Sequence, residues 1–239
     1  IAYFAYVHLG LHPFLSIPLG GAVMFVLGYT IQMGLINKVV TQPVLTTLTL
    51  TFGLDMIMYN AMTVAWSATP RRITLDFGRL EMGDILMPFD RIAAMGLALL
   101  LTGLLFWILR TSRTGRAIVA VRMDRDAAAL MGIRVNHIYA ITFGIGALMA
   151  GATGSLLATV FPVTTNLTGL FLGKAFVVCV IGGLGGVSGA LVGGLVLGLI
   201  ESFAGHWLGP QHAITIGFAL MLLILLTRPT GLLGKRGYE

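Results

Sequence analysis

Charged side chains are scarce in this sequence. Asp, Glu, Lys and Arg make up 10% of its 239 residues, whereas hydrophobic residues make up 57%. Soluble domains carry about 25% charged residues, so this chain has too few to cover a globule in water. Positions 135–173, 175–200 and 202–227 contain no charged residue at all. The composition predicts an integral membrane protein whose apolar surface faces lipid.

Cysteine is almost absent, and the patterns of common metal and nucleotide sites are missing. The single Cys179 forms no intrachain disulfide, and we expect it to pack as a small hydrophobic residue. The stretch "GLFLGKA" at 169–175 is not a phosphate-binding loop, because three residues rather than four separate its glycines and Ala175 replaces the magnesium-binding Ser or Thr. We therefore expect no cofactor and no metal on this chain. The histidines are scattered without acidic or cysteine partners at ligand spacing: His8, His12, His137, His206 and His212.

The positive charge is concentrated in two places, which explains the net charge of +6 without a nucleic-acid partner. One is the loop 110–136 and the other is the tail from residue 228. Basic clusters beside apolar spans mark the cytoplasmic side of a membrane protein. The clustered residues are Arg110, Arg113, Arg116, Arg122, Arg125 and Arg134, followed by Arg228, Lys235 and Arg236.

Long apolar runs predict an all-α, polytopic transmembrane helical bundle that forms a single domain over 1–239. About 20 apolar residues cross the hydrocarbon core of a bilayer. The first residues, "IAYFAYVHLG", look like the end of a transmembrane helix, and we expect that helix to begin before Ile1. The predicted spans are 14–36, 44–65, 92–109, 137–160 and 211–228.

The topology of the apolar segment 172–205 follows from counting crossings. If 110–136 and the tail from residue 228 are both cytoplasmic, the chain between them must cross the membrane an even number of times. The predicted spans 137–160 and 211–228 supply two of these crossings, so 172–205 must itself cross an even number of times. It forms either two short helices that meet at "GGLGGVSGALVGG" or a broken re-entrant pair. Irregular backbone at membrane depth needs protein or water around it, so we expect these glycines at a packed centre or pathway. The same alternation makes 66–90 an external loop, although Arg71, Arg72 and Arg79 weaken that assignment.

One compact polar helix interrupts the apolar chain at "RMDRDAAALMGIRVN", residues 122–136. Asp124 is a favourable N-cap residue, the alanines favour a helix, and Gly132 is a favourable residue at the C-terminal end of the helix. The helix is too short to be stable alone and needs a surface to hold it. Its small side chains favour a groove in another protein, and the alternative is a helix lying on the lipid headgroups.

This stretch resembles the EAA loop of ABC importer permeases, with Asp126 in place of Glu and without the usual Ile and Leu-Pro continuation. In that family the loop forms a coupling helix that docks in a cleft of the cytoplasmic ATPase, which we call the coupling role. The resemblance gives this role to Arg125, Asp126, Ala127, Ala128, Leu130 and Gly132.

Longer runs narrow the resemblance. "GRAIVAVRMDRDAAALMGIRVN", "GKAFVVCVIGGLGGVSG" and "TRPTGLLG" are similar to the permease subunits of branched-chain amino acid importers. This implies import of such amino acids by alternating access in the bacterial inner membrane. It also implies a homologous permease, two ATPase subunits that bind ATP and Mg²⁺, and a periplasmic binding protein. A urea or short-amide permease, an ion-coupled carrier and a non-transporting scaffold stay open as alternatives.

Several residues are candidates for the transport pathway or for helix packing. Asp55 and Glu201 lie in or at the end of apolar spans, where ionisable groups are costly and often functional. Lys174 is expected near the outer membrane surface, either snorkelling or at the outer mouth. The glycines either allow close helix packing or form a break that lines the route. These glycines are Gly182, Gly183, Gly185, Gly186 and Gly189.

Overall fold

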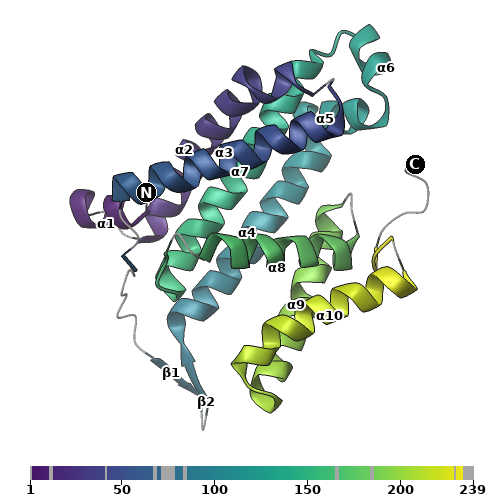
Figure 1. The fold of residues 1–239 in the computed structure, drawn as a ribbon. Coiled ribbons are helices and arrows are strands. Elements are labelled where there is room, and N and C mark those ends of the chain that lie inside the picture. Colours follow the sequence, from purple (N-terminus) through teal and green to yellow (C-terminus); the bar gives the residue numbers. More distant parts are fainter. Residues whose placement is uncertain are drawn as a thin grey trace. The chain divides into compact units, whose positions relative to one another are not determined.

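A computed structural model of the chain describes residues 2–10, 13–40, 42–66, 69–70, 79–82, 85–164, 167–183, 186–228 and 230–233. The chain divides into two compact units, Ile1–Thr165 and Asn166–Glu239, and each is described by itself. Helices dominate both units, so the predicted all-α class is confirmed (Figure 1).

The first unit contains eight helical segments and one short hairpin among its described residues. They are α1 (Ala2–Leu9), α2 (Pro13–Gly34), η1 (Ile36–Lys38), α3 (Val44–Trp66), β1 (Arg79–Met82), β2 (Ile85–Pro88), α4 (Phe89–Thr111), α5 (Arg113–Met123), α6 (Arg125–Leu130) and α7 (Val135–Val160). Strands β1 and β2 pair antiparallel within the predicted external loop 66–90. The hairpin and α6 lie at opposite ends of α4 (Figure 1).

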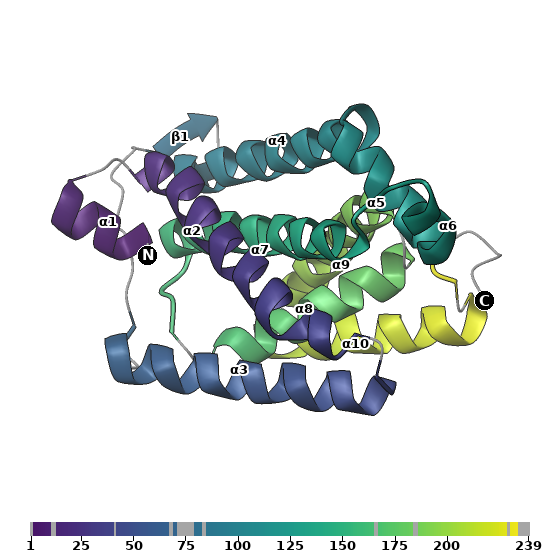
Figure 2. The same cartoon turned by 90° about the horizontal axis from the view of Figure 1, so that it is seen from above.

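Helices α2 and α7 form the central contact of this unit, and Figure 2 shows them side by side. They run antiparallel and meet at small residues. A Cβ atom on Gly20 would lie 2.5 Å from Ser155 Oγ, and one on Gly28 would lie 2.5 Å from the Cβ of Ala147. The two backbones can approach this closely only because the glycines have no side chain. Ile17 and Leu156 are buried beside this contact.

The second unit is a three-helix group made of α8 (Leu167–Gly182), α9 (Val187–Trp207) and α10 (Pro210–Thr227). Its core contains Val177, Ile181, Leu197 and Ile224. The segment 172–205 thus lies within two helices, α8 and α9. Both predicted alternatives, two short helices and a broken re-entrant pair, contain such a pair, so how it crosses the membrane stays a prediction. The two helices run antiparallel, because Gly182 lies against Gly189 and Val178 lies against Gly193.

Four helices among the described residues are long and apolar enough to cross a membrane: Leu15–Lys38, Arg91–Thr111, Val135–Val160 and Val187–Trp207. They confirm the predicted spans 14–36, 92–109 and 137–160. The predicted span 44–65 is helical, but α3 is not in this set, because its threonines, Asp55 and Asn60 lower its hydropathy. The predicted span 211–228 is a shorter apolar helix, Gln211–Thr227.

The antiparallel packing of α8 and α9 predicts a strong response to one added methyl group. A Cβ on Gly193 would lie 2.5 Å from the carbonyl oxygen of Val178, so we expect Gly193→Ala to destabilise the protein by about 2 kcal/mol through overpacking. Gly198 on the same helix has open space around it, and Gly198→Ala is the matched control. Thermal unfolding in detergent measures both variants. Equal unfolding midpoints would contradict the close packing.

Candidate functional site

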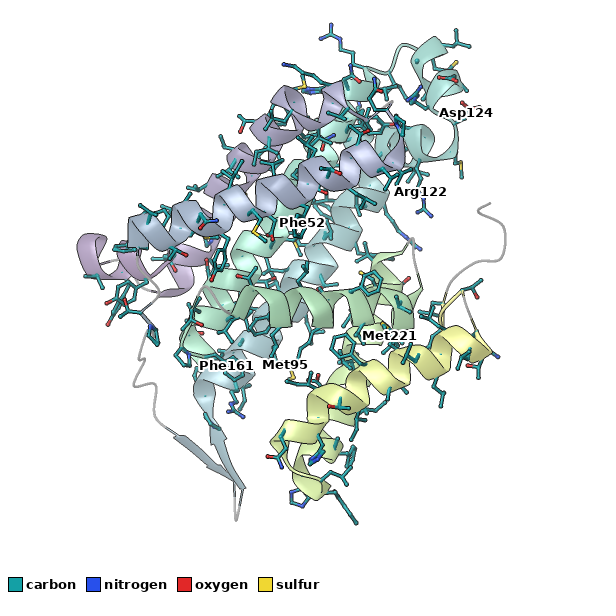
Figure 3. The ribbon with its side chains drawn as sticks, in the orientation of Figure 1. Phe52, Met95, Arg122, Asp124, Phe161 and Met221 are labelled. Carbon is teal, nitrogen blue, oxygen red and sulfur yellow. The ribbon has the colours of Figure 1, made fainter. Side chains whose placement is uncertain are left out.

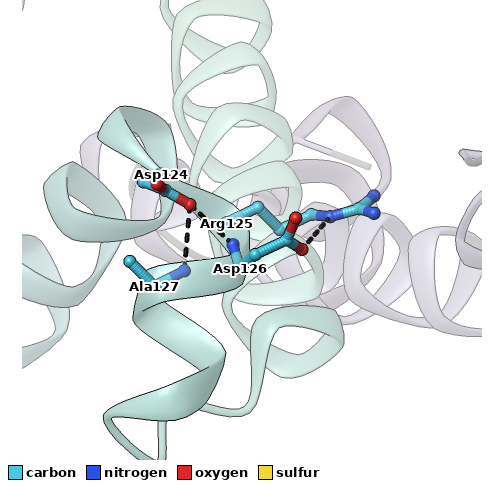
Figure 4. Close-up of polar contacts among 4 residues, drawn as sticks. All are labelled: Asp124, Arg125, Asp126 and Ala127. Atoms are coloured by element: carbon cyan, nitrogen blue, oxygen red, sulfur yellow. Dashed lines mark hydrogen bonds and ion pairs between the residues drawn. The ribbon is translucent and has the colours of Figure 1, made fainter.

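The short helix α6 begins at a well-formed N-cap (Figure 4). Asp124 Oδ1 accepts hydrogen bonds from the backbone N–H groups of Asp126 and Ala127, each at 2.9 Å. This satisfies two of the donors that a helix start leaves without partners. The predicted N-cap is confirmed. Arg125 Nε lies 3.6 Å from Asp126 Oδ1, and both side chains are exposed, so this ion pair adds little stability.

The C-terminal end of α6 is equally defined. Gly132 has a φ of +83°, which a side chain would make costly. Its N–H donates to the carbonyl of Ala129 at 3.0 Å, and the N–H of Ile133 donates to that of Ala128 at 3.1 Å. This pair of bonds is the Schellman motif. Both ends of α6 are thus set by its own sequence, although the helix has only six residues.

The preceding helix α5 was missed by the sequence reasoning, which treated 110–136 as a loop with one helix. The Ser112 side chain accepts a hydrogen bond from the N–H of Gly115 at 2.9 Å and caps α5. A Cβ on Gly115 would overlap the backbone of Leu109, so glycine allows the chain to turn sharply after α4. The Ser112 cap and the apolar spacing of Ala117, Ile118 and Val121 were the signals that could have indicated this helix.

One face of α6 packs on its own subunit and another is exposed. Ala128 is buried at 5% exposure, together with Val121 of α5 and Ile138 of α7. By contrast, Leu130 is 89% exposed and Met131 is 83% exposed. Figure 3 shows Asp124 and Arg122 at the same outer end of the helices. Ala128 therefore fixes α6 to the helices, and Leu130 and Met131 form an apolar tip.

Polar contacts connect this end of the molecule to α2. Asn37 Nδ2 donates to the carbonyl of Asn136 at 3.0 Å, and Gln32 Nε2 donates to Asn37 Oδ1 at 3.0 Å. The Tyr29 hydroxyl and His137 Nδ1 are hydrogen-bonded at 2.9 Å. Residues 136 and 137 are close to α6 in sequence, at the start of α7. These hydrogen bonds therefore join the start of α7, directly after α6, to α2 and η1. The sequence reasoning did not find these contacts.

The glycine break between α8 and α9 is held by the C-terminal segment. The N–H of Leu232 donates to the carbonyl of Ile181 at 2.9 Å, and that of Leu233 donates to the carbonyl of Gly182 at 3.2 Å. These bonds satisfy carbonyls that the end of α8 would leave without partners. Gly183 and Gly231 lie against each other, with φ of +92° and +77°. The run "TRPTGLLG" thus has a structural role that the sequence alone did not show.

The five predicted glycines divide by their surroundings. Gly182 and Gly189 have no room for a Cβ, so they serve packing. Gly183 contacts the C-terminal segment, and Gly186 is the N-cap of α9 in an extended conformation. Gly185 lies outside the described residues. That the break also lines a substrate route stays a prediction.

Lys174 and Glu201 were treated separately in the sequence, but the structure brings them together. Lys174 Nζ donates to Glu201 Oε2 at 2.6 Å, and their side chains are 28% and 20% exposed. Lys174 is the eighth residue of the 16 in α8. It therefore lies midway along this helix. The two side chains thus form a direct ion pair, and the expected places of Lys174 and Glu201 near the outer membrane surface stay predictions.

Comparison with a protein-family model identifies the family of this chain. The model "Branched-chain amino acid transport system / permease component" matches residues 1–227. The chain belongs to this permease family. The multi-pass membrane architecture of the permease agrees with its apolar helices.

Curated relatives of this permease point the same way. The high-affinity branched-chain amino acid permease LivH of Escherichia coli K12 is 41% identical over 132 residues, which are 55% of this chain and 43% of LivH. BraD of Pseudomonas aeruginosa is 34% identical over 78% of this chain and 63% of BraD. The probable LivH of Methanocaldococcus jannaschii is 26% identical over 94% of this chain and 76% of its own length. The match thus spans less than half of the E. coli protein. No solved structure matches the permease.

Two other expectations concern single residues of the permease. Asp55 is exposed, and no residue along the whole of α3 is buried, so its proposed place on the pathway stays a prediction. Cys179 is exposed on this chain, because Val177 and Ile181 occupy the buried face of α8, and the expectation that it packs as a small hydrophobic residue stays a prediction. Among the described residues, no group of three His, Cys, Asp or Glu side chains could hold a metal ion.

The contact between Gly231 and Gly183 predicts that the C-terminal segment detaches when Gly231 is enlarged. A Cβ there would lie 2.5 Å from the Gly183 Cα, and the alanine would also have to adopt the backbone φ of +77°. We expect Gly231→Ala to destabilise the permease by about 2 kcal/mol. Gly209 has a φ of +93° but open space around it, so Gly209→Ala measures the conformational cost alone. Trypsin cleavage at Arg228, faster in Gly231→Ala than in Gly209→Ala, is the readout. Equal cleavage rates would show that the segment does not depend on this contact.

Proposed function

We propose that this chain is a permease subunit of an ATP-driven importer of branched-chain or related hydrophobic amino acids. It acts in the bacterial inner membrane by alternating access. Its partners are a homologous permease, two cytoplasmic ATPase subunits that bind ATP and Mg²⁺, and a periplasmic binding protein. The chain itself catalyses no reaction. The family match and the names of LivH and BraD support the cargo, and they do not favour urea, short amides or an ion-coupled carrier.

The observation that carries the coupling role is the two-sided packing of α6. Ala128 is buried against α5 and α7, whereas Leu130 and Met131 face outward. An exposed apolar tip on a helix with fixed ends suits insertion into a groove of another protein. A helix lying on lipid would need a broad apolar face, and Arg125, Asp126 and Ala127 are exposed beside this tip.

The mechanism follows from how α6 is attached. When the ATPases close on ATP, they displace α6 through its exposed tip. The displacement reaches α7 through the packing of Ala128 against Ile138, and it reaches α2 through the hydrogen bond from Asn37 to Asn136. Because the glycines of α2 and α7 pack closely against small side chains such as Ser155 and Ala147, the two helices move together. The pathway then opens alternately to the two sides of the membrane.

Leu130→Glu tests the docking of α6. Leu130 is 89% exposed, so the charge leaves folding unchanged, but it opposes burial in an ATPase groove at a cost of about 2 kcal/mol. We expect copurification of the ATPases and ATP-dependent leucine uptake in proteoliposomes to fall about tenfold or more. Leu130→Met is the control, because it keeps an apolar side chain. Normal uptake by Leu130→Glu would refute the coupling role. A wild-type complex that binds ATPase but imports no aliphatic amino acid would refute the cargo.

Asn37→Leu tests the link between α6 and α2. The change removes the hydrogen bonds to Asn136 and Gln32, each worth about 1 kcal/mol. We expect ATPase binding to persist and leucine uptake per ATP hydrolysed to fall about fivefold. The control is Thr30→Val, because the Thr30 hydroxyl bonds only to carbonyls of its own helix, Val26 and Leu27, in the described contacts. Unchanged stoichiometry in Asn37→Leu would show that α2 is not moved through this contact.

A further inference from the structure

Three exposed arginines gather where α4 ends and α5 begins, at the end of α4 away from β1 (Figure 2). Arg110 lies in the last turn of α4, Arg113 is the first residue of α5, and Arg116 follows one turn later. Arg116 Nη1 donates to the carbonyl of Thr111, the last residue of α4, at 3.0 Å, so this side chain reaches back to the end of α4. We call Arg110, Arg113 and Arg116 the arginine cluster.

No acidic side chain balances the arginine cluster. Positions 91–123 contain no Asp or Glu, and in the described part of the chain none of the three guanidinium groups forms an ion pair with a carboxylate. The next acidic residue, Asp124, accepts the N-cap hydrogen bonds of α6, and Asp126 lies beside Arg125. The cluster therefore presents an uncompensated positive charge to its surroundings.

The end of α4 places this cluster at the level of the lipid headgroups. The helix Arg91–Thr111 is long and apolar enough to cross a membrane, and none of its apolar stretch is buried within the chain. Because about 20 residues cross the hydrocarbon core, the residues around Thr111 lie at its edge. Trp107 is 63% exposed one turn earlier, and exposed tryptophan is typical of this interface. The Arg110 guanidinium lies 4.3 Å from the centroid of the Phe106 ring, so it is folded back toward the same level.

The exposed face of α5 combines positive charge with apolar side chains. Val121 on its opposite face is buried with Ile138 of α7. Cationic and apolar residues exposed together are typical of helices at a membrane surface. The segment 124–130 differs, because it carries two aspartates that would repel an anionic lipid, and α5 carries none. The exposed residues of α5 recur at intervals of three or four and so share one face: Arg113, Arg116, Val119 and Met123.

The uncompensated charge and its place at the membrane surface together define a partner. We propose that the arginine cluster binds the headgroup of an anionic phospholipid such as phosphatidylglycerol. Arg113 and Arg116 donate to the phosphate oxygens, because the planar guanidinium matches phosphate with two parallel hydrogen bonds. The acyl chains lie along the exposed apolar surface of α4 beside Trp107. A zwitterionic phospholipid has the same phosphate but adds a cationic group, which the cluster repels.

Quenching of tryptophan fluorescence by brominated lipids tests this inference. The chain has three tryptophans, and Trp66→Phe/Trp207→Phe leaves only Trp107. This full chain is reconstituted in mixed liposomes of phosphatidylglycerol and phosphatidylcholine, with one of the two lipids brominated at a time. The quenching of Trp107 gives the relative binding constant of the two lipids beside α4. We expect phosphatidylglycerol to be preferred about fivefold or more at low salt, and less at high salt, where the charges are screened.

Arginine variants in the same background show which charges cause the preference. Arg113→Gln/Arg116→Gln removes two charges and keeps polar, helix-forming side chains, so the preference should fall to about twofold or less. Arg113→Lys/Arg116→Lys keeps both charges and should keep most of the preference. Arg91→Gln removes one charge at the other end of α4 and should leave the preference at Trp107 unchanged. Variants are compared at equal thermal unfolding midpoints.

Three outcomes would overturn the inference. Equal quenching by the two lipids in the chain with unchanged arginines would do so without any arginine variant. A full preference in Arg113→Gln/Arg116→Gln would show that other groups attract the lipid. If that variant keeps the preference but loses copurification with the ATPases, the cluster contacts a protein and not the membrane. The assay requires no transport, so its result does not depend on the cargo.

Discussion

Close approach of helix backbones at glycine is the constraint on which both units depend. Lipid tails are as apolar as leucine, so helices in a bilayer gain little from burying apolar side chains and are held by packing. In the first unit, Gly20, Gly28 and Gly151 bring α2 and α7 together. In the second, Gly182, Gly189 and Gly193 do the same for α8 and α9. At each of these positions glycine leaves the space that a side chain would occupy to the facing helix.

The second constraint is that the backbone groups at helix ends need hydrogen-bond partners. Carbonyl groups at a helix end need partners, most of all where water is excluded. The end of α8 receives them from Leu232 and Leu233 of the C-terminal segment. The end of α6 is closed by its own turn at Gly132. Because α6 needs no further partner for its backbone, its apolar side chains at Leu130 and Met131 stay available to another protein.

Charge is used sparingly and in two different ways. The arginines of the α4–α7 connection are exposed with α6, where solvent screens them. Lys174 and Glu201 are partly buried and neutralise each other within an apolar helix group. The first arrangement favours orientation and contact with water-soluble partners. The second keeps two opposite charges paired in an otherwise apolar helix group.

The sequence by itself determined the helical class, three of the five spans, the N-cap at Asp124 and the stop at Gly132, because these follow from local hydropathy and local hydrogen bonding. It also indicated the family, through runs of residues between positions 115 and 234. Only the tertiary structure decided that Lys174 pairs with Glu201, that Asn37 holds Asn136 and that "TRPTGLLG" closes the end of α8. These contacts join residues far apart in sequence. Their formation depends on which helix faces meet, and no local pattern encodes that.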